Sequence, residues 1–188
     1  MPTTKPIPGR ISRGAKPDRP VVGMVMVYRY LWRHEREAGS RYPEKNRPVV
    51  VVAVMEKNGR TEVMLHPIST RHQSDERIDI FKLSEFDIHA AGLDRGSSVV
   101  VSEHNVEDWS SPDFVEARGV FVLGFLHPRI ANAIRAKSTA RSAIGMMNGL
   151  ERIDGSLRPI ASSESERILR EGGPIAASSI RRDGRKIV

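Results

Sequence analysis

The sequence predicts a mainly β protein, a small and strongly bent antiparallel barrel of five or six strands closed by one C-terminal helix. Short runs rich in β-branched residues recur along the chain, at 21–28, 49–54, 61–66, 78–81, 97–103 and 117–126. Glycines at 119 and 124 interrupt the last run, which suggests bulges or a sharp bend. Apolar residues that recur at helical spacing occupy only short segments by comparison. Many short bent strands and few helices are typical of a small barrel.

The first predicted strand, 21–28, ends in a cluster of aromatic residues that includes Tyr28, Tyr30 and Trp32. Packing in the core or in a dimer interface is the favoured interpretation for Tyr28 and Trp32. Stacking on an unpaired nucleic-acid base is the alternative. The polar stretch 34–46 follows, and long loops in compact domains often carry function.

A hairpin is predicted at the centre of the chain. Residues 49–54 are a nearly unbroken β-branched run, Asn58-Gly59 suits a tight turn, and residues 61–66 alternate before Pro67 ends the ladder. Because a hairpin brings its outer ends together, Arg47 is expected beside Ser69 and Thr70. A cation and two hydroxyls there can hold a phosphate, although such residues are also common at strand ends.

Two helices are predicted after the hairpin. Ser84 suits the N-cap of a short helix through 91, and Pro128 suits the first turn of a helix through about 140. Residues 1–20, which contain five prolines, are predicted to be a disordered basic arm. Residues 141–188 are predicted to be a basic, mostly disordered tail, with a weak helical turn or two near 162–170. The folded domain is therefore expected to span 21–140.

The net charge of +7 lies in the tails. Residues 1–20 carry five basic residues and one acidic residue, and residues 141–188 carry nine and six, so 21–140 is neutral overall. Within that domain, basic residues gather around the first loop: Arg29, Arg33, Arg36, Arg41, Lys45 and Arg47. A neutral domain with one basic cleft fits RNA cleavage better than duplex binding, and a solvated loop is the simpler alternative.

Several functional classes are not expected from the sequence. The chain has no cysteine, hence no disulfide, thiol chemistry or Cys-based zinc site. No apolar run approaches a membrane span, and the first twenty residues lack the apolar core of a secretory signal, so a cytoplasmic protein is expected. Phosphate-loop, dinucleotide-binding, zinc-protease and serine-hydrolase motifs are not found. We expect no cofactor and no metal, and a metal-independent reaction on a phosphodiester remains consistent.

Three segments, in this order, resemble the PemK/MazF toxin family of type II toxin–antitoxin systems: Gly23–Val27, the run from Arg47-Pro48 through Val52, and Pro67-Ile68-Ser69-Thr70. The resemblance covers about 21–140. Met24 stands where the family has an acidic residue, and Ser69 stands where it has threonine. The resemblance implies an SH3-like (PemK/CcdB-type) barrel. It also implies that residues 103–106 form a strand with a polar residue facing the substrate.

The resemblance implies that Arg47 and Ser69 are the catalytic pair, and Thr70 adds a second hydroxyl. Candidate RNA-binding residues are Arg29, Trp32, Arg33, Arg41, Lys45, His66, Arg71 and His72. Arginine hardly deprotonates and is a poor general base. His66 and His72 bracket the motif and could assist proton transfer, with a structural or solvated role as the alternative.

The function implied is a metal-independent endoribonuclease toxin that cleaves single-stranded mRNA and is inhibited by a cognate antitoxin. Such toxins act in growth inhibition, plasmid maintenance or stress response. The expected partners are single-stranded RNA, an acidic antitoxin segment and a second copy in a symmetric homodimer, with no membrane association. A non-catalytic module that binds nucleic acid or protein on the same barrel, like a gyrase-poisoning relative, is the alternative.

Overall fold

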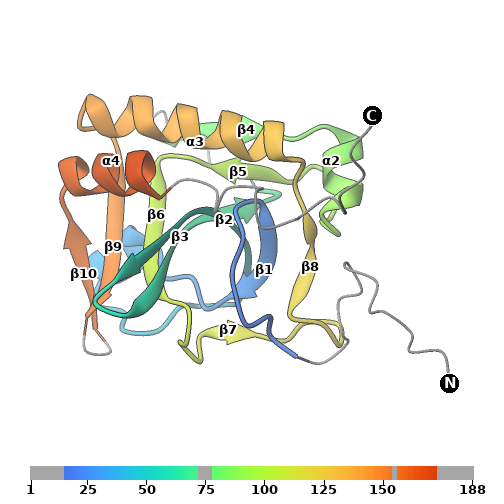
Figure 1. Ribbon diagram of the computed structural model, residues 1–188, viewed down its shortest axis with the longest axis horizontal. Coiled ribbons are helices and arrows are strands. Elements are labelled where there is room, and N and C mark those ends of the chain that lie inside the picture. The colour runs from blue at the N-terminus through green and yellow to red at the C-terminus, as the bar shows by residue number, and fades with distance from the viewer. Residues whose placement is uncertain (1–14, 72–77, 154–155, 173–188) are drawn as a thin grey trace, which may run out of the picture.

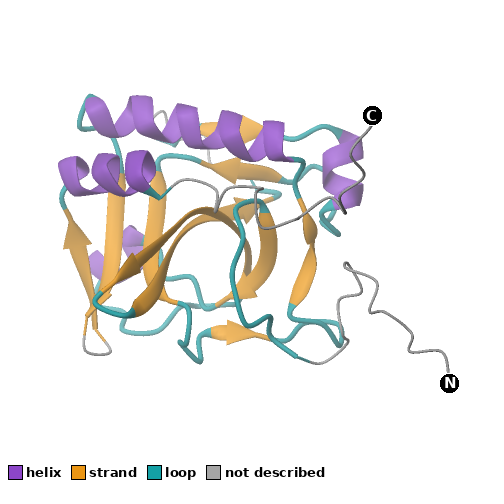
Figure 2. Cartoon of the chain, in the orientation of Figure 1, coloured by secondary structure: helices purple, strands orange, loops and turns teal. Residues whose placement is uncertain are grey.

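The computed structural model describes residues 15–71, 78–153 and 156–172. They form a ten-stranded, mostly antiparallel sheet with helices packed against it (Figure 1). Figure 2 shows α3 (Pro128–Ala143) and α4 (Ser162–Glu171) gathered along one side of the sheet. In this part of the chain, no helix combines the length and the hydrophobicity needed to cross a bilayer.

The main path of the sheet has the strand order β10-β9-β6-β3-β2-β1-β7. Its strands are β1 (Met24–Tyr28), β2 (Arg47–Lys57), β3 (Arg60–Ser69), β6 (Glu103–Asp108), β7 (Phe114–Val115), β9 (Asn148–Ile153) and β10 (Ser156–Ile160). Off this path, β4 (Ile80–Lys82) pairs with β5 (Ser98–Val100), β5 pairs with β3, and β8 (Val122–Phe125) pairs with β1. The remaining helices are α1 (Arg33–Glu37) and α2 (Glu85–Ala90). The pair β6–β9 is parallel and the others are antiparallel.

The predicted central hairpin is confirmed as β2 and β3. Asn58 and Gly59 both adopt positive φ, at 53° and 75°, which a tight turn requires. Val49 of β2 pairs with Pro67 of β3, and the register of the two strands shifts between Val51 and Ala53. That shift is a bulge, which accommodates one extra residue and bends the strand.

Residues 49–54 of strand β2 are all apolar because this part of the strand is buried on both faces. Val50 and Val52 pack in the core beneath α3 and α4, whereas Val49 and Val51 pack in a second core with Met26. Burying a valine-sized side chain stabilises the fold by about 1.5–3 kcal/mol. The β-branched run is therefore the common wall of two cores.

The closed barrel of five or six strands that we predicted is not what forms. A bent, mostly antiparallel sheet with C-terminal helices is confirmed, but it has ten strands, and its main path ends at β10 and β7 without closing. The physical reason is that β9 adds to β6 in parallel and β10 extends the sheet further. Edge strands paired in this way continue a sheet instead of closing it.

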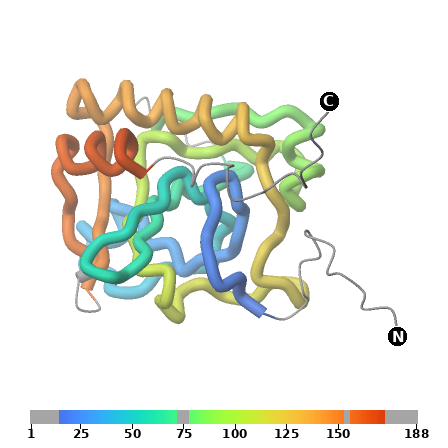
Figure 3. Tube along the Cα trace, in the orientation of Figure 1, coloured from blue at the N-terminus to red at the C-terminus, as the bar shows by residue number. Residues whose placement is uncertain are grey.

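The prediction of a mostly disordered tail from 141 is wrong for residues 148–153 and 156–171. Figure 3 traces this segment, in orange to red, beside β6 and α3. Leu150, Ile168 and Leu169 are buried, and Arg152 forms an ion pair with Glu107 at 2.6 Å. One isolated leucine and one Ile-Leu pair are too few to reveal a core strand and helix by themselves, but Ile168 and Leu169 complete a core that the rest of the chain supplies.

The predicted disordered arm is likewise wrong for residues 15–20. The Lys16 ammonium donates to the carbonyl of Trp109 and lies 4.5 Å and 4.4 Å from the ring centroids of Trp109 and Phe114. The Trp109 indole donates to the Pro17 carbonyl at 3.0 Å. The segment is ordered by a cation and two aromatic rings. Residues 1–14 and 173–188 lie outside the described residues.

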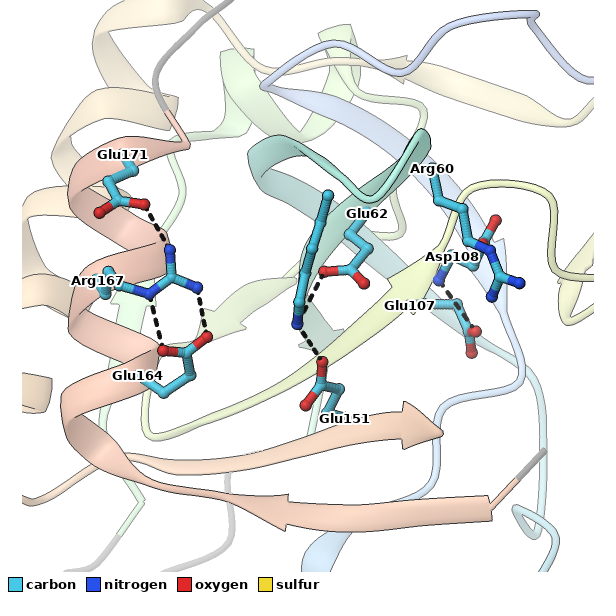
Figure 4. A network of polar contacts seen from close by, with 9 residues as sticks. Arg60, Glu62, Glu107, Asp108, Glu151, Glu164, Arg167 and Glu171 are labelled. Atoms are coloured by element: carbon cyan, nitrogen blue, oxygen red, sulfur yellow. Dashed lines mark hydrogen bonds and ion pairs between the residues drawn. The ribbon is translucent and has the colours of Figure 1, made fainter. Parts of the chain in front are cut away.

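Polar contacts tie the C-terminal segment to the hairpin tip (Figure 4). Lys57 Nζ lies 3.1 Å from Glu151 Oε1 and 3.7 Å from Glu62 Oε2, while Arg167 contacts Glu164 and Glu171 along α4. Burial raises the pKa of Glu62. Partly exposed pairs of this kind contribute up to about 1 kcal/mol each, so the network aligns the segment more than it stabilises it.

Gly124, predicted to mark a bend, lies where β8 meets α2. A Cβ there would lie 2.4 Å from the Ala90 carbonyl oxygen and 2.8 Å from Ala91 Cα, and neither backbone atom can rotate away. We expect Gly124→Ala to lower the free energy of unfolding by about 1–3 kcal/mol in urea denaturation. Gly39→Ala is the comparison, because open space and a φ of 91° there mean that alanine costs backbone strain without a clash. No measurable loss in Gly124→Ala would contradict a steric cause.

Candidate active site

A cavity of about 400 Å³ opens at the end of the hairpin where β2 begins and β3 ends. Six of the residues predicted for the site line it: Trp32, Lys45, Arg47, Ser69, Thr70 and Arg71. Its size is within the range typical of small-ligand sites, roughly 300–1,000 Å³. The segment before α1 and the starts of β5 and β6 supply further walls.

The sheet register explains why these residues meet. Val49 pairs with Pro67 across the hairpin, so Arg47 and Ser69 emerge at the same end of β2 and β3. On the outer sides, Arg47 pairs with Tyr28 and Ser69 pairs with Ser98. The predicted neighbourhood of Arg47 and Ser69 is therefore a direct consequence of strand pairing.

Arg47 is a partly desolvated cation. Its guanidinium carbon lies 5.1 Å from the ring centroid of Trp32, and its Nε is buried without a hydrogen-bond partner in the described part of the chain. Burial lowers the pKa of Arg47, Glu35 and Glu44 oppose that shift, and Arg71 adds to it. The side chain stays charged because arginine hardly deprotonates. A buried donor beside a second cation favours an anionic ligand.

Ser69 shapes the backbone at the rim of the cavity. Its hydroxyl donates to the Arg71 carbonyl at 3.0 Å and accepts from the Arg71 N–H at 3.1 Å. This local turn holds Arg71 beside the cavity. The Thr70 side chain is exposed at the same rim. A phosphate would therefore find the Thr70 hydroxyl accessible, whereas the Ser69 hydroxyl must exchange its bond to Arg71.

Trp32 packs against several neighbours. Besides Arg47, its ring has Tyr30 edge-on at 5.1 Å and His34 stacked at 6.1 Å. These contacts support the packing interpretation of Trp32, with the added effect that its ring orients the Arg47 cation. Stacking on an RNA base stays a prediction.

The other predicted RNA-binding residues do not line this cavity. Arg29 lies 3.7 Å from Asp113, Arg33 pairs with Glu37 at 2.6 Å, and Arg41 is exposed. His66 is fully buried, so its predicted contact with RNA is wrong. Strand β3 has a core on both faces, and the His66 ring packs toward α3. His72 lies outside the described residues.

His66 has a structural role instead. Its Nδ1 lies 2.6 Å from the Glu103 carbonyl oxygen and its Nε2 lies 2.8 Å from the Ser138 hydroxyl. The ring of His104, itself 3.1 Å from the Ser165 hydroxyl, stands 6.0 Å away. Burial lowers the pKa of His66 to about 4 and that of His104 well below its usual value.

These lowered pKa values predict acid sensitivity. Between pH 6.5 and 4 the unfolded chain binds a proton at His66 that the folded chain does not, so stability falls as the pH drops through that window. The loss due to His66 is about 3 kcal/mol, with His104 adding in the same direction. Urea denaturation at pH 7 and pH 4 measures it. His66→Gln should weaken the pH dependence, and His89→Gln, at an exposed site, should not. An unchanged dependence in His66→Gln would contradict the assignment.

Glu103 and His34 are among the residues that line the cavity but were not assigned to the site. Glu103, the first residue of β6, accepts the Arg33 N–H at 3.3 Å, and burial raises its pKa while that bond and His34 oppose the shift. His34, in α1, is exposed and stacks on Trp32. The predicted polar residue in 103–106 was the available signal for Glu103. His34 lay in the polar loop without any distinguishing pattern.

Together the cavity holds Lys45 and two arginines, hydroxyls, an imidazole and three carboxyl groups, of which that of Glu103 has a raised pKa. No known protein-family model matches the chain, and no curated protein is detectably similar to it in sequence. The chemistry of the site must therefore be argued from its own geometry. Cations for a phosphate together with two groups able to transfer protons suit a phosphodiester reaction.

Proposed function

We propose that this protein is a metal-independent endoribonuclease that cleaves single-stranded RNA in the cavity beside Arg47. The observation that carries the proposal is the Arg47 guanidinium, whose buried Nε is unpaired among the described residues and which shares the cavity with Ser69 and Arg71. This arrangement suits bidentate binding of a phosphodiester. The resemblance of residues 21–140 to PemK/MazF toxins points to the same activity.

RNA supplies its own nucleophile. The 2′-oxygen loses its proton, attacks the adjacent phosphorus, and the bond from phosphorus to the 5′-oxygen breaks. The products are a 2′,3′-cyclic phosphate and a free 5′-hydroxyl. Arg47 and Arg71 offset the negative charge on the phosphoryl oxygens as it develops, and Thr70 or Ser69 donates a hydrogen bond to the same oxygens.

Glu103 and His34 are the groups that move protons in this scheme. The Glu103 carboxylate takes the proton of the 2′-hydroxyl, and its raised pKa brings it closer to the strength that general bases need. The His34 imidazolium donates a proton to the leaving 5′-oxygen, a task suited to imidazole near neutral pH. Both residues line the cavity that holds Arg47.

The deciding experiment is incubation of the purified protein with a long single-stranded RNA in EDTA. We expect cleavage that leaves 2′,3′-cyclic phosphate ends and is blocked by a single deoxy substitution at the cut site. Equal cleavage of the deoxy substrate would overturn the mechanism. Binding without cleavage would support the alternative, a non-catalytic nucleic-acid-binding module.

The remaining partners are part of the same proposal. An acidic antitoxin segment would bind over the cavity, where Lys45, Arg47 and Arg71 lie together. A symmetric homodimer and growth inhibition on expression of the chain alone follow from the resemblance. Neutralising the three cations should weaken binding of the acidic segment.

A further inference from the structure

Helix α1 forms part of the wall of the cavity but lacks an anchor of its own. It has five residues, and none of them is buried. Isolated helices of this length are unstable in water. Yet α1 carries His34 and directly follows Trp32, and both residues line the cavity. Whatever holds α1 therefore determines where the His34 ring lies, and it adds to the contacts by which Trp32 packs against Tyr30 in the second core.

The support comes from the hairpin β9–β10, which is distant from α1 in the sequence. Arg36 Nε donates to the Leu157 carbonyl of β10 at 2.9 Å, and the Arg33 guanidinium donates to the Asn148 side chain of β9. The Arg33 N–H adds a bond to Glu103 at 3.3 Å. Two of these three contacts reach the hairpin β9–β10. The contacts are polar and involve long flexible side chains. They therefore orient α1 more than they stabilise the fold.

The hairpin itself is held firmly. Asn148 pairs with Glu103 and Gly149 with His104 in the parallel β6–β9 ladder. A Cβ at Gly149 would lie 2.3 Å from His104 Nε2 and 2.1 Å from Ile160 Cγ2, so the two strands and β10 are in closest contact there. Helix α4 follows with Ile168 and Leu169 buried. A rigid hairpin can serve as a fixed support.

We infer that β9–β10 acts as a strut for the cavity wall and that Arg36 is the positioning residue that joins it to α1. Through α1, the strut positions His34, whose ring stacks on Trp32, the residue that contacts the Arg47 cation. The effect on catalysis rests on the proposed function, whereas the effect on ring positions does not. Arg36 acts through other residues and is not itself in the cavity lining.

The test compares Arg36→Ala and Arg36→Lys with Arg41→Ala, a neighbouring exposed arginine. Protein labelled with 5-fluorotryptophan contains two reporters, because the chain has two tryptophans, Trp32 and Trp109. A Trp32→Phe variant assigns the fluorine signals. We expect Arg36→Ala to shift or broaden the Trp32 signal and leave the Trp109 signal unchanged, Arg36→Lys to restore it in part, and Arg41→Ala to leave both unchanged.

Cleavage is then measured at saturating RNA. We expect Arg36→Ala to lower the rate about tenfold, with the thermal midpoint unchanged and partial rescue by lysine. An unchanged Trp32 signal in Arg36→Ala would overturn the strut. A shifted signal with full cleavage would overturn its role in catalysis. A shifted signal in a protein whose wild type does not cut RNA would support the strut and refute the proposed function.

Discussion

Replacing Arg47 with alanine is expected to lower the rate of RNA cleavage by two to three orders of magnitude while the fold is retained. The guanidinium is the group best placed for bidentate contact with a phosphate, and its Nε is an unpaired buried donor within the described residues. Losing such a contact in the transition state costs about 3–4 kcal/mol. The residue begins β2 at the cavity and lies outside both hydrophobic cores.

Single-turnover cleavage of one RNA substrate measures the effect, with circular dichroism and the thermal midpoint as checks on folding. Arg47→Lys should recover part of the rate because it keeps the charge and loses the fork of donors. Arg95→Ala is the matched control, an exposed arginine outside the cavity lining. Cleavage by Arg47→Ala at the wild-type rate would refute the ribonuclease proposal.

Glu103→Gln is expected to lower the rate about 10²–10⁴-fold, because the amide keeps the shape of the side chain and cannot take a proton. Burial raises the pKa of Glu103. A general base works only when deprotonated, so wild-type activity should be lost as the pH falls through that raised pKa. The loss therefore occurs at a higher pH than for an ordinary glutamate.

A pH–rate profile of kcat/KM tests this directly. The variant should lose the acidic limb of the profile along with most of its rate. Glu44→Gln is the control, since Glu44 also lines the cavity but is exposed. A Glu103→Gln enzyme with the wild-type rate and the same acidic limb would remove Glu103 from the mechanism and leave His34 as the residue to examine.

Burial is the reason that the site predicted from the sequence and the observed cavity overlap only in part. Alternation along β3 suggested that His66 points away from one core, yet β3 has a second core behind it, and the ring is enclosed. Conversely, Glu103 is a common surface residue type, and its raised pKa arises from the elements that surround it. Neither the burial of His66 nor the raised pKa of Glu103 can be predicted from the residues adjacent in the sequence.

By itself, the sequence determined the central hairpin and the meeting of Arg47 with Ser69 and Thr70. A β-branched run, an Asn-Gly turn and a terminating proline are local signals, and antiparallel pairing converts them directly into proximity. Only the tertiary structure decided that the sheet stays open, that His66 is in the core, and that β9 and β10 contact α1. These outcomes depend on contacts between distant segments, such as β6 with β9 and Arg36 with Leu157. No local pattern specifies such contacts, because each forms only when the other elements have already shaped its partner surface.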